Sequence, residues 1–314
     1  WPATYVDVTA AGNGTGTEAS PFWTCHAAVT AANATGQPAR IFIKGGTPIV
    51  RTKGISNSGS VIPVVPVVFI AYSGRAVVGA HENLTWAVDA TITTGVVYKA
   101  ARSNMSLLID LLGRDENGYY PRFPVRASAA DVGAFGGVYT DNTSIWVKRS
   151  DGVAVTDANT RCFLAVDNLR LNGTTQTSVA YIGATENDGF DFEGGSGGTL
   201  RVSYTGGGAS TRRVIYAKDC TFRYGGHSTG ATGNIAIEGF NGTVFLDSCD
   251  WSNGATDGMN VHNALGATKT ALLTLNCTGR NFGLTSSYVS NNFWTLHDSN
   301  VVGIDLCSDG GQAR

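Results

Sequence analysis

The feature that most constrains the fold is a repeat in the last hundred residues of the sequence. Four cysteines lie 29, 28 and 30 residues apart, each just before a turn that contains glycine: Cys220, Cys249, Cys277 and Cys307. A fixed period of about 20 to 50 residues is typical of folds built from stacked copies of one small unit. The sequence therefore predicts that this part of the chain is a stack of repeats.

The residues around the cysteines predict what the unit is. Apolar residues alternate along the chain and the alternation then slips by one position, which indicates a strand that buries every second side chain and then bends. The residues expected to point inward are Ile215, Ala217, Cys220 and Phe222; Val244, Leu246, Cys249 and Trp251; Val302 and Ile304; and, in an earlier copy, Leu164, Val166, Leu169 and Leu171. Cys277 is ambiguous, because Leu273 and Leu275 would reach it without a slip.

At the slip, four copies carry a side chain that bonds nearby backbone and favours irregular turns, and only Leu306 departs from this: Asn168, Asp219, Ser248 and Asn276. The unit is then a strand, a bend, a short strand and a turn. One unit cannot bury its own apolar row, but copies stacked about 4.8 Å apart enclose a continuous interior. The sequence predicts an all-β fold, a parallel β-solenoid.

Within such a stack we expect the cysteines to be buried free thiols that pack like small apolar residues. Disulfides between successive copies are the alternative, since the α-carbons would lie near enough, but directly paired strands rarely hold a well-angled bridge. A structural metal is disfavoured, because no C-x-x-C pair or Cys/His cluster at ligand spacing occurs.

Composition excludes several classes of partner. Only 15% of the 314 residues are charged and the net charge is −2, which gives no electrostatic attraction for nucleic acid or anionic lipid. The most hydrophobic stretch, residues 61–74, is short and broken by Pro63 and Pro66, so no membrane span is expected. The 41 glycines disfavour long helices and suit a β-rich fold with many turns.

Residues 5–47 carry, in order, a strand ending in Val-Asp, a Gly/Asn turn, the sequence PFWT and the strand IFIKGGT, followed by Pro48 in place of the usual aromatic residue. With these motifs the sequence resembles right-handed parallel β-helix proteins of the pectate-lyase-like superfamily, which include secreted polysaccharide lyases and phage tailspikes. We expect Ser20 to cap a short helix that begins at Pro21 and closes the end of the solenoid. Residues 1–50 would form this cap and residues 51–314 the coils.

Residues 249–311 contain DGMNVH and, about one copy later, NNFWTLHD, and there they resemble bacterial and phage β-helices. That superfamily hosts lyases, hydrolases, isomerases and inert scaffolds, so the resemblance implies the fold and not the reaction. Similarity to tailspikes and secreted depolymerases implies an extracellular or virion-associated protein and a homotrimer. Residues 50–160 resemble nothing in these proteins.

The candidate catalytic residues come from three matching strands, NIAIEG, GMNVHN and FWTLHD. The pattern predicts that Glu238, His262 and His297 face outward on successive copies, with Asn260 one outward step earlier and Asp257 in the preceding turn. An acid and two imidazoles about 5 Å apart perturb one another's protonation, which is typical of a site. The alternative is a purely structural role, in which His262 and Asn260 bond the turn backbone and Asp257-Gly258 is merely a turn.

Two chemistries fit this column. In a lyase acting on an acidic sugar, a histidine removes the proton next to the carboxylate while a cation or amide neutralises the developing charge. In a hydrolase two carboxylates flank the glycosidic bond, and Glu238 with Asp257 or Asp298 would supply them. Imidazoles outnumber acids in the column, so the lyase is favoured.

Substrate-binding candidates are a set of cations and two aromatic residues that would stack on sugars: Arg212, Arg213, Arg223, Trp251 and Tyr288. The bland alternative is solvated surface charge for the arginines and a core position for Trp251, which the alternation itself favours. No cofactor is required, although Asp188, Asp191 and Glu193 leave a Ca²⁺ site open. The first interpretation is therefore a β-helix that cleaves a long polysaccharide, and the second is a non-catalytic glycan-binding or structural β-helix.

Overall fold

The computed structural model of the protein describes residues 1–55, 63–115, 118–166, 168–172, 179–184, 188–203, 213–226, 233–254, 257–262, 269–280, 282, 294–296 and 301–306. The chain forms two compact units, the first made of Trp1–Ala80 with Val166–Arg314 and the second of His81–Ala165. The described part is mostly β, with several parallel sheets and two α-helices. Among these residues no helix has the length and apolar character needed to cross a membrane.

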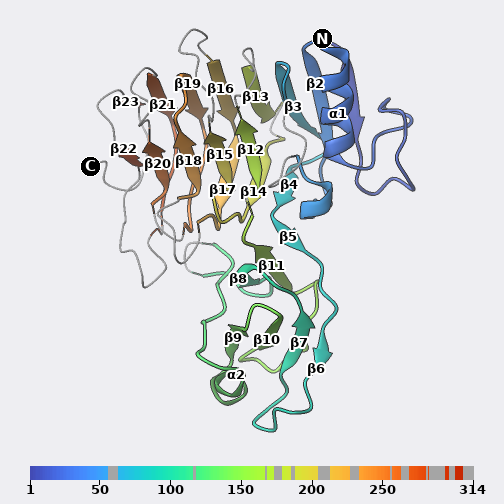
Figure 1. Ribbon diagram of the computed structural model, residues 1–314, viewed down its shortest axis with the longest axis vertical. Coiled ribbons are helices and arrows are strands. Elements are labelled where there is room, and N and C mark those ends of the chain that lie inside the picture. Colours follow the sequence, from blue (N-terminus) through green and yellow to red (C-terminus); the bar gives the residue numbers. More distant parts are fainter. Residues whose placement is uncertain are drawn as a thin grey trace. The chain divides into compact units, whose positions relative to one another are not determined.

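The first unit contains three parallel sheets (Figure 1). Sheet A has the order β1 (Ala3–Val6), β2 (Ala39–Lys44), β3 (Val67–Tyr72), β13 (Val179–Ala184), β16 (Arg213–Lys218), β19 (Gly242–Asp247), β21 (Thr270–Leu275) and β23 (Val301–Leu306). Sheet B has the order β12 (Leu169–Asn172), β15 (Leu200–Ser203), β18 (Ile235–Glu238), β20 (Met259–His262) and β22 (Trp294–Leu296). Sheet C has the order β4 (Ala76–Gly79), β14 (Phe190–Glu193) and β17 (Cys220–Arg223).

The chain visits these sheets in a recurring order. Strands β16, β17 and β18 lie in sheets A, C and B, and β19 then returns to sheet A beside β16. The rows of paired residues continue across copies, as in Ile215, Val244 and Leu272 of sheet A. The predicted stacking of the cysteine segments as successive parallel strands is therefore confirmed in the described residues.

The predicted bend is also present before Cys220, Cys249 and Cys277. Asp219, Ser248 and Asn276 adopt left-handed backbone with φ of 53°, 54° and 51°. The N–H of each donates to a carbonyl of the next copy, as from Ser248 to Leu275 at 2.8 Å. Short polar residues tolerate this conformation better than bulky ones, which explains their recurrence here.

The structure resolves one ambiguity of the repeat and shows that two details were wrong. In β21 the buried residues are Leu272 and Thr274, so the chain slips before Cys277 as it does before the other cysteines. In β23, Ile304 pairs with the outward Leu273 and is largely exposed, so it does not point inward as expected. Asp305 of β23 is the residue paired with the buried Thr274 of β21, and its carboxylate accepts a hydrogen bond from the Thr274 hydroxyl.

The second error concerns the earlier copy. Leu169 begins β12 of sheet B and therefore does not occupy the cysteine position. Asn168 is buried before it, and its side-chain amide donates to the carbonyls of Val78 and Glu193. The true earlier bend is Ser73, with φ of 54°, between β3 and β4.

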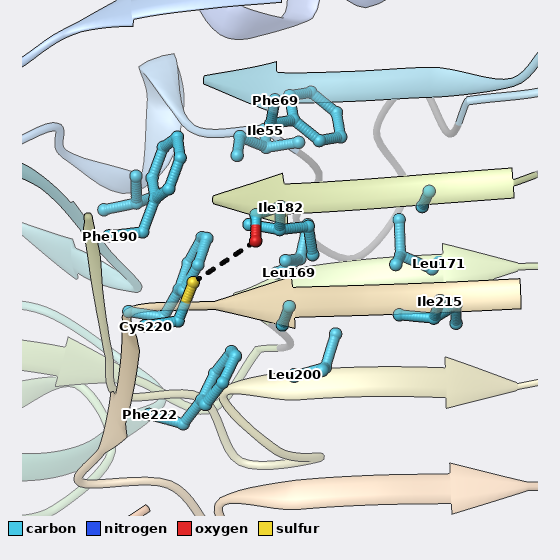
Figure 2. Packing of buried hydrophobic residues seen from close by; sticks show 14 of the residues in the cluster. Ile55, Phe69, Leu169, Leu171, Ile182, Phe190, Leu200, Ile215, Cys220 and Phe222 are labelled. Carbon is cyan, nitrogen blue, oxygen red and sulfur yellow. Dashed lines mark hydrogen bonds between the residues drawn. The ribbon is translucent and has the colours of Figure 1, made fainter. Parts of the chain in front are cut away.

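The interior of the first unit is one apolar cluster to which all three sheets contribute. Phe190, Phe192 and Phe222 of sheet C stack there with ring centroids 5.4 Å apart. Figure 2 shows the sulfur of Cys220 pointing at the carbonyl oxygen of Ile182, 3.6 Å away. Cys249 and Cys277 make the same contact with Ala217 and Leu246, so the thiols form a column.

At the N-terminal end, helix α1 (Cys25–Thr35) packs into the same cluster through Ala28, Val29 and Ala32. The expected cap was wrong, because Thr24 and not Ser20 accepts the hydrogen bond from the first turn. Residues 20–22 are extended instead, and Phe22 bonds the backbone of β1 at Tyr5 and Asp7. A 3-10 turn, η1 (Arg51–Lys53), follows β2.

The second unit has antiparallel sheets, a feature that the interpretation of residues 51–314 as continuous coils did not contain. One sheet has the order β6 (Ala87–Val88), β7 (Tyr98–Ala101), β10 (Ser144–Lys148) and β9 (Gly137–Thr140), and the other β5 (His81–Glu82), β11 (Thr160–Leu164) and β8 (Met105–Asp110). Helix α2 (Ala129–Phe135) begins at the cap residue Ser128 and packs on β9 and β10. The unit is inserted in the sequence between β4 and β12.

The described cysteines are all free and buried: Cys25, Cys162, Cys220, Cys249 and Cys277. We predict that all five react with a thiol reagent in unfolded protein without reductant, and that none reacts rapidly in the folded protein, because burial withholds the thiolate. Mass spectrometry after labelling measures both states. A described cysteine that stays unlabelled after unfolding would contradict the free thiols.

Alkaline pH should destabilise the fold through the same groups. Burial raises the pKa of Cys25 from 9.0 to about 12. An acid whose pKa is higher in the folded state contributes stability that is complete below pH 9 and is lost as the pH rises toward 12. The free energy of unfolding, measured by urea titration from pH 8 to 11, should therefore fall more steeply for the native protein than for Cys25→Ala. Equal slopes would contradict this cause.

Candidate functional site

The candidate site lies on the outward side of sheet B. Glu238 at the end of β18 is paired in register with His262 at the end of β20. Both side chains reach solvent, Glu238 with 36% of its side chain exposed and His262 as an exposed residue. Adjacent parallel strands lie about 4.8 Å apart, so a carboxylate and an imidazole project side by side. The predicted neighbourhood of these two residues is confirmed.

An arginine on the preceding strand forms an ion pair with Glu238. The Nη2 atom of Arg201 on β15 donates to Oε2 of Glu238 at 2.8 Å. Arg170 on β12 is the in-register neighbour of Arg201, so two cations follow each other along the same row. Among the described residues, the outward side of sheet B therefore carries two arginines, one carboxylate and one imidazole within four successive strands.

Two of the predicted catalytic residues are buried. Asn260 takes the outward register beside Ala236, yet only 4% of it is exposed. Its amide donates to Oδ2 of Asp257 at 3.4 Å, and Asp257 is buried as well. The expectation that these two side chains are accessible was wrong, since both are buried and hydrogen-bonded to each other.

The glycine in that turn has a packing role. A Cβ atom on Gly258 would lie 2.6 Å from the Trp251 ring and 2.5 Å from the Phe282 ring. No side chain fits there without displacing both rings. The Asp257-Gly258 pair therefore fits the structural alternative, in which it forms a turn and has no catalytic role.

Several candidates lie outside the described residues: His297, Asp298, Arg212 and Tyr288. Strand β22 ends at Leu296, which is paired with Val261. Nothing is concluded about the third member of the predicted column.

The other substrate-binding candidates are placed away from solvent or in ion pairs. Trp251 is fully buried in the core at 0% exposure, so it is not a sugar platform, as its place in the alternation already favoured. Arg213 is also buried, at 5% exposure, so its expected surface role was wrong. The guanidinium of Arg223 is bound to Asp250, with Nε 3.0 Å from Oδ1, on sheet C rather than sheet B.

The residues considered for Ca²⁺ have other partners. Asp191 accepts from Nε of Arg75 at 2.6 Å and from the Thr221 hydroxyl at 2.6 Å. Asp188 accepts from the backbone N–H of Gly74, and Glu193 is buried. In the described part of the chain, no group of three His, Cys, Asp or Glu residues is arranged to hold a metal ion.

Sequence reasoning did not single out the partner of Glu238. Neither Arg201 nor Arg170 is among the candidate residues that the sequence suggested. The available signal was the matching register of LRLN, LRVS and IAIE in β12, β15 and β18, in which each arginine takes the outward position two before the last residue.

Comparisons with known proteins give little. No family model matches the sequence and no curated protein matches it. Among solved structures, a chain titled "Glycoside hydrolase" is 9% identical, with 90% of this chain and 74% of that chain covered and a TM-score of 0.35. At this level the likeness carries no argument about activity.

The burial of Trp251 gives a direct test. We predict that Trp251→Ala lowers the free energy of unfolding by about 3–5 kcal/mol, because a large side chain is removed from a packed core. Val214→Ala on the outward side of sheet A is the control and should change it by less than about 1 kcal/mol. Chemical denaturation of both variants measures the difference. Native stability of Trp251→Ala would contradict the burial of this side chain in the core.

Proposed function

We propose that the parallel sheets of the first unit form a right-handed β-solenoid whose sheet B face binds and cleaves an acidic polysaccharide by β-elimination. The observation that carries this is the register of Glu238 beside His262 with Arg201 bound to Glu238. The cation on β15 and the base on β20 flank the carboxylate on β18, and a base and a fixed cation are the two groups that proton removal next to a carboxylate requires. The parallel rows of sheet B suit a linear polymer better than a small metabolite.

The roles follow from chemistry. Arg201, with Arg170 beside it, binds the carboxylate of a uronic acid unit and stabilises the charge that develops there. His262 takes the proton from the adjacent carbon. The electron pair left behind forms a carbon–carbon double bond, the bond to the glycosidic oxygen breaks, and that oxygen takes a proton from water. Glu238 is a positioning residue, because it touches Arg201 and orients its guanidinium.

Two observations favour the lyase over the hydrolase. Hydrolysis needs two carboxylates on either side of the scissile bond. Among the described residues of this face, Glu238 is the accessible carboxylate, whereas Asp257 is buried against Asn260. The Oε2 atom of Glu238 is moreover occupied by Nη2 of Arg201 at 2.8 Å, so this carboxylate is engaged in an ion pair.

A non-catalytic glycan-binding β-helix is the second candidate. The burial of Asn260 and Asp257 favours it, since two groups expected to assist chemistry are used for structure. Both candidates share the binding surface and differ in whether His262 acts on the polymer. An extracellular or virion-associated location and a homotrimeric assembly belong to the same proposal, and they rest on the sequence resemblance to tailspikes and secreted depolymerases.

Incubation with panels of acidic and neutral polysaccharides tests the proposal. We predict absorbance in the unsaturated-uronate band together with new reducing ends for an acidic polymer. His262→Ala should lower the rate by about two orders of magnitude. Glu238→Gln should act mainly through KM, because it releases Arg201 from its position.

The control is Lys218→Ala, which removes a cation from the outward side of sheet A and should leave the rate unchanged. Reducing ends without the absorbance would replace the lyase by a hydrolase. Binding of an acidic polymer without either signal would leave the non-catalytic candidate. Full activity of His262→Ala would contradict the assignment of the catalytic site to sheet B.

A further inference from the structure

The second unit contains a pocket of its own. Its volume is about 190 Å³, and it lies between β10, the segment 121–126 and the end of α2. A pocket of this size suits one small ligand, such as a single sugar ring, rather than a long polymer. All lining residues belong to the second unit, so the pocket is separate from sheet B.

The pocket is lined by three cations and one carboxylate. The cations are Arg122, Arg126 and Lys148, and the carboxylate is Asp110. Asp110 is already bound by Nη1 of the buried Arg149 at 2.6 Å. The pocket therefore has an excess of positive charge.

Two of these cations are held by uncharged acceptors. Lys148 donates from Nζ to the carbonyl of Gly133 at 2.5 Å, and Arg126 donates from Nε to the carbonyl of Gly136 at 2.5 Å. These carbonyls end helix α2, which explains why cations gather there. Carbonyl oxygens orient the side chains without cancelling their charge, and within the described residues no carboxylate is paired with Lys148 or Arg126.

The remaining walls are apolar and rigid. Pro121, Phe123 and Pro124 form one side, and Phe135 forms part of the rim with 71% of its surface exposed. Gly137 keeps the floor open, because its φ of 115° disfavours other residues and a Cβ there would lie 2.3 Å from the Pro124 carbonyl oxygen. An exposed aromatic ring beside cations is suited to a ligand with one apolar face and one anionic group.

We propose that this pocket binds a single carboxylate-bearing sugar residue, with the carboxylate on Arg126 and Lys148 and the apolar face of the ring on Phe135. The anion site rests on the pocket alone, whereas the choice of a sugar rests on the proposed function. The pocket is then a binding site for one acidic sugar unit within the second unit, and its binding does not depend on cleavage at sheet B.

Ligand-detected NMR titration of the full chain with galacturonate, galactose and acetate tests this. We expect galacturonate to bind with a Kd of about 1 mM, the order for a ligand of this size, and galactose and acetate at least tenfold more weakly. Lys148→Met should raise the galacturonate Kd about tenfold or more. Phe135→Ala should also raise it and, because this ring is exposed, should leave the unfolding midpoint unchanged.

Lys99→Met is the matched control, since this lysine lies in the same unit with its Nζ over the Trp146 ring and does not line the pocket. Its galacturonate affinity should equal that of the native protein. Binding that is unaffected by both Lys148→Met and Phe135→Ala overturns the proposal, as does equal binding of galactose or acetate. Cleavage and galacturonate binding are measured separately. Failure of His262→Ala to lower cleavage counts against the proposed function, whereas failure of Lys148→Met and Phe135→Ala to weaken galacturonate binding counts against this site.

Discussion

The in-register parallel ladder between successive copies is the interaction on which the rest of the first unit depends. Each strand of sheets A and B hydrogen-bonds to the strand one copy away, so a residue's neighbour is set by the repeat and not by local sequence. The same ladder places apolar rows in one core. The left-handed bends at Asp219, Ser248 and Asn276 keep the copies aligned, because each N–H bonds the following copy.

Much of the stacking and burial in the first unit could be predicted, because the repeat and the apolar alternation are visible in the sequence. The burial of Cys220, Phe222 and Trp251 and the pairing of Glu238 with His262 follow from parity alone. Parity fails where both faces are apolar, as in β21, where alternation does not tell Leu272 from Leu273. The second unit was not predicted, because its short antiparallel strands have no repeat and interrupt the sequence between two copies.

The candidate site was predicted in part for a related reason. Register predicts which residues are neighbours, but it does not predict which outward residues are covered by the turns beside them. Asn260 is outward by register, yet it is buried and bonded to Asp257, and no alternation pattern contains that contact. The ion pair of Arg201 with Glu238 is diagonal, one strand across and two residues along, so a comparison of equivalent positions alone does not reveal it.

The central claim is that Glu238 and His262 project side by side from neighbouring strands. The most direct measurement is the unfolding midpoint of Glu238→His with and without Ni²⁺, since two adjacent imidazoles form a metal site and binding to the folded state raises its stability. The account predicts that Ni²⁺ raises the midpoint of Glu238→His by several degrees and leaves that of the double variant Glu238→His with His262→Ala unchanged. No effect of Ni²⁺ on Glu238→His, or an equal effect on both variants, would contradict it.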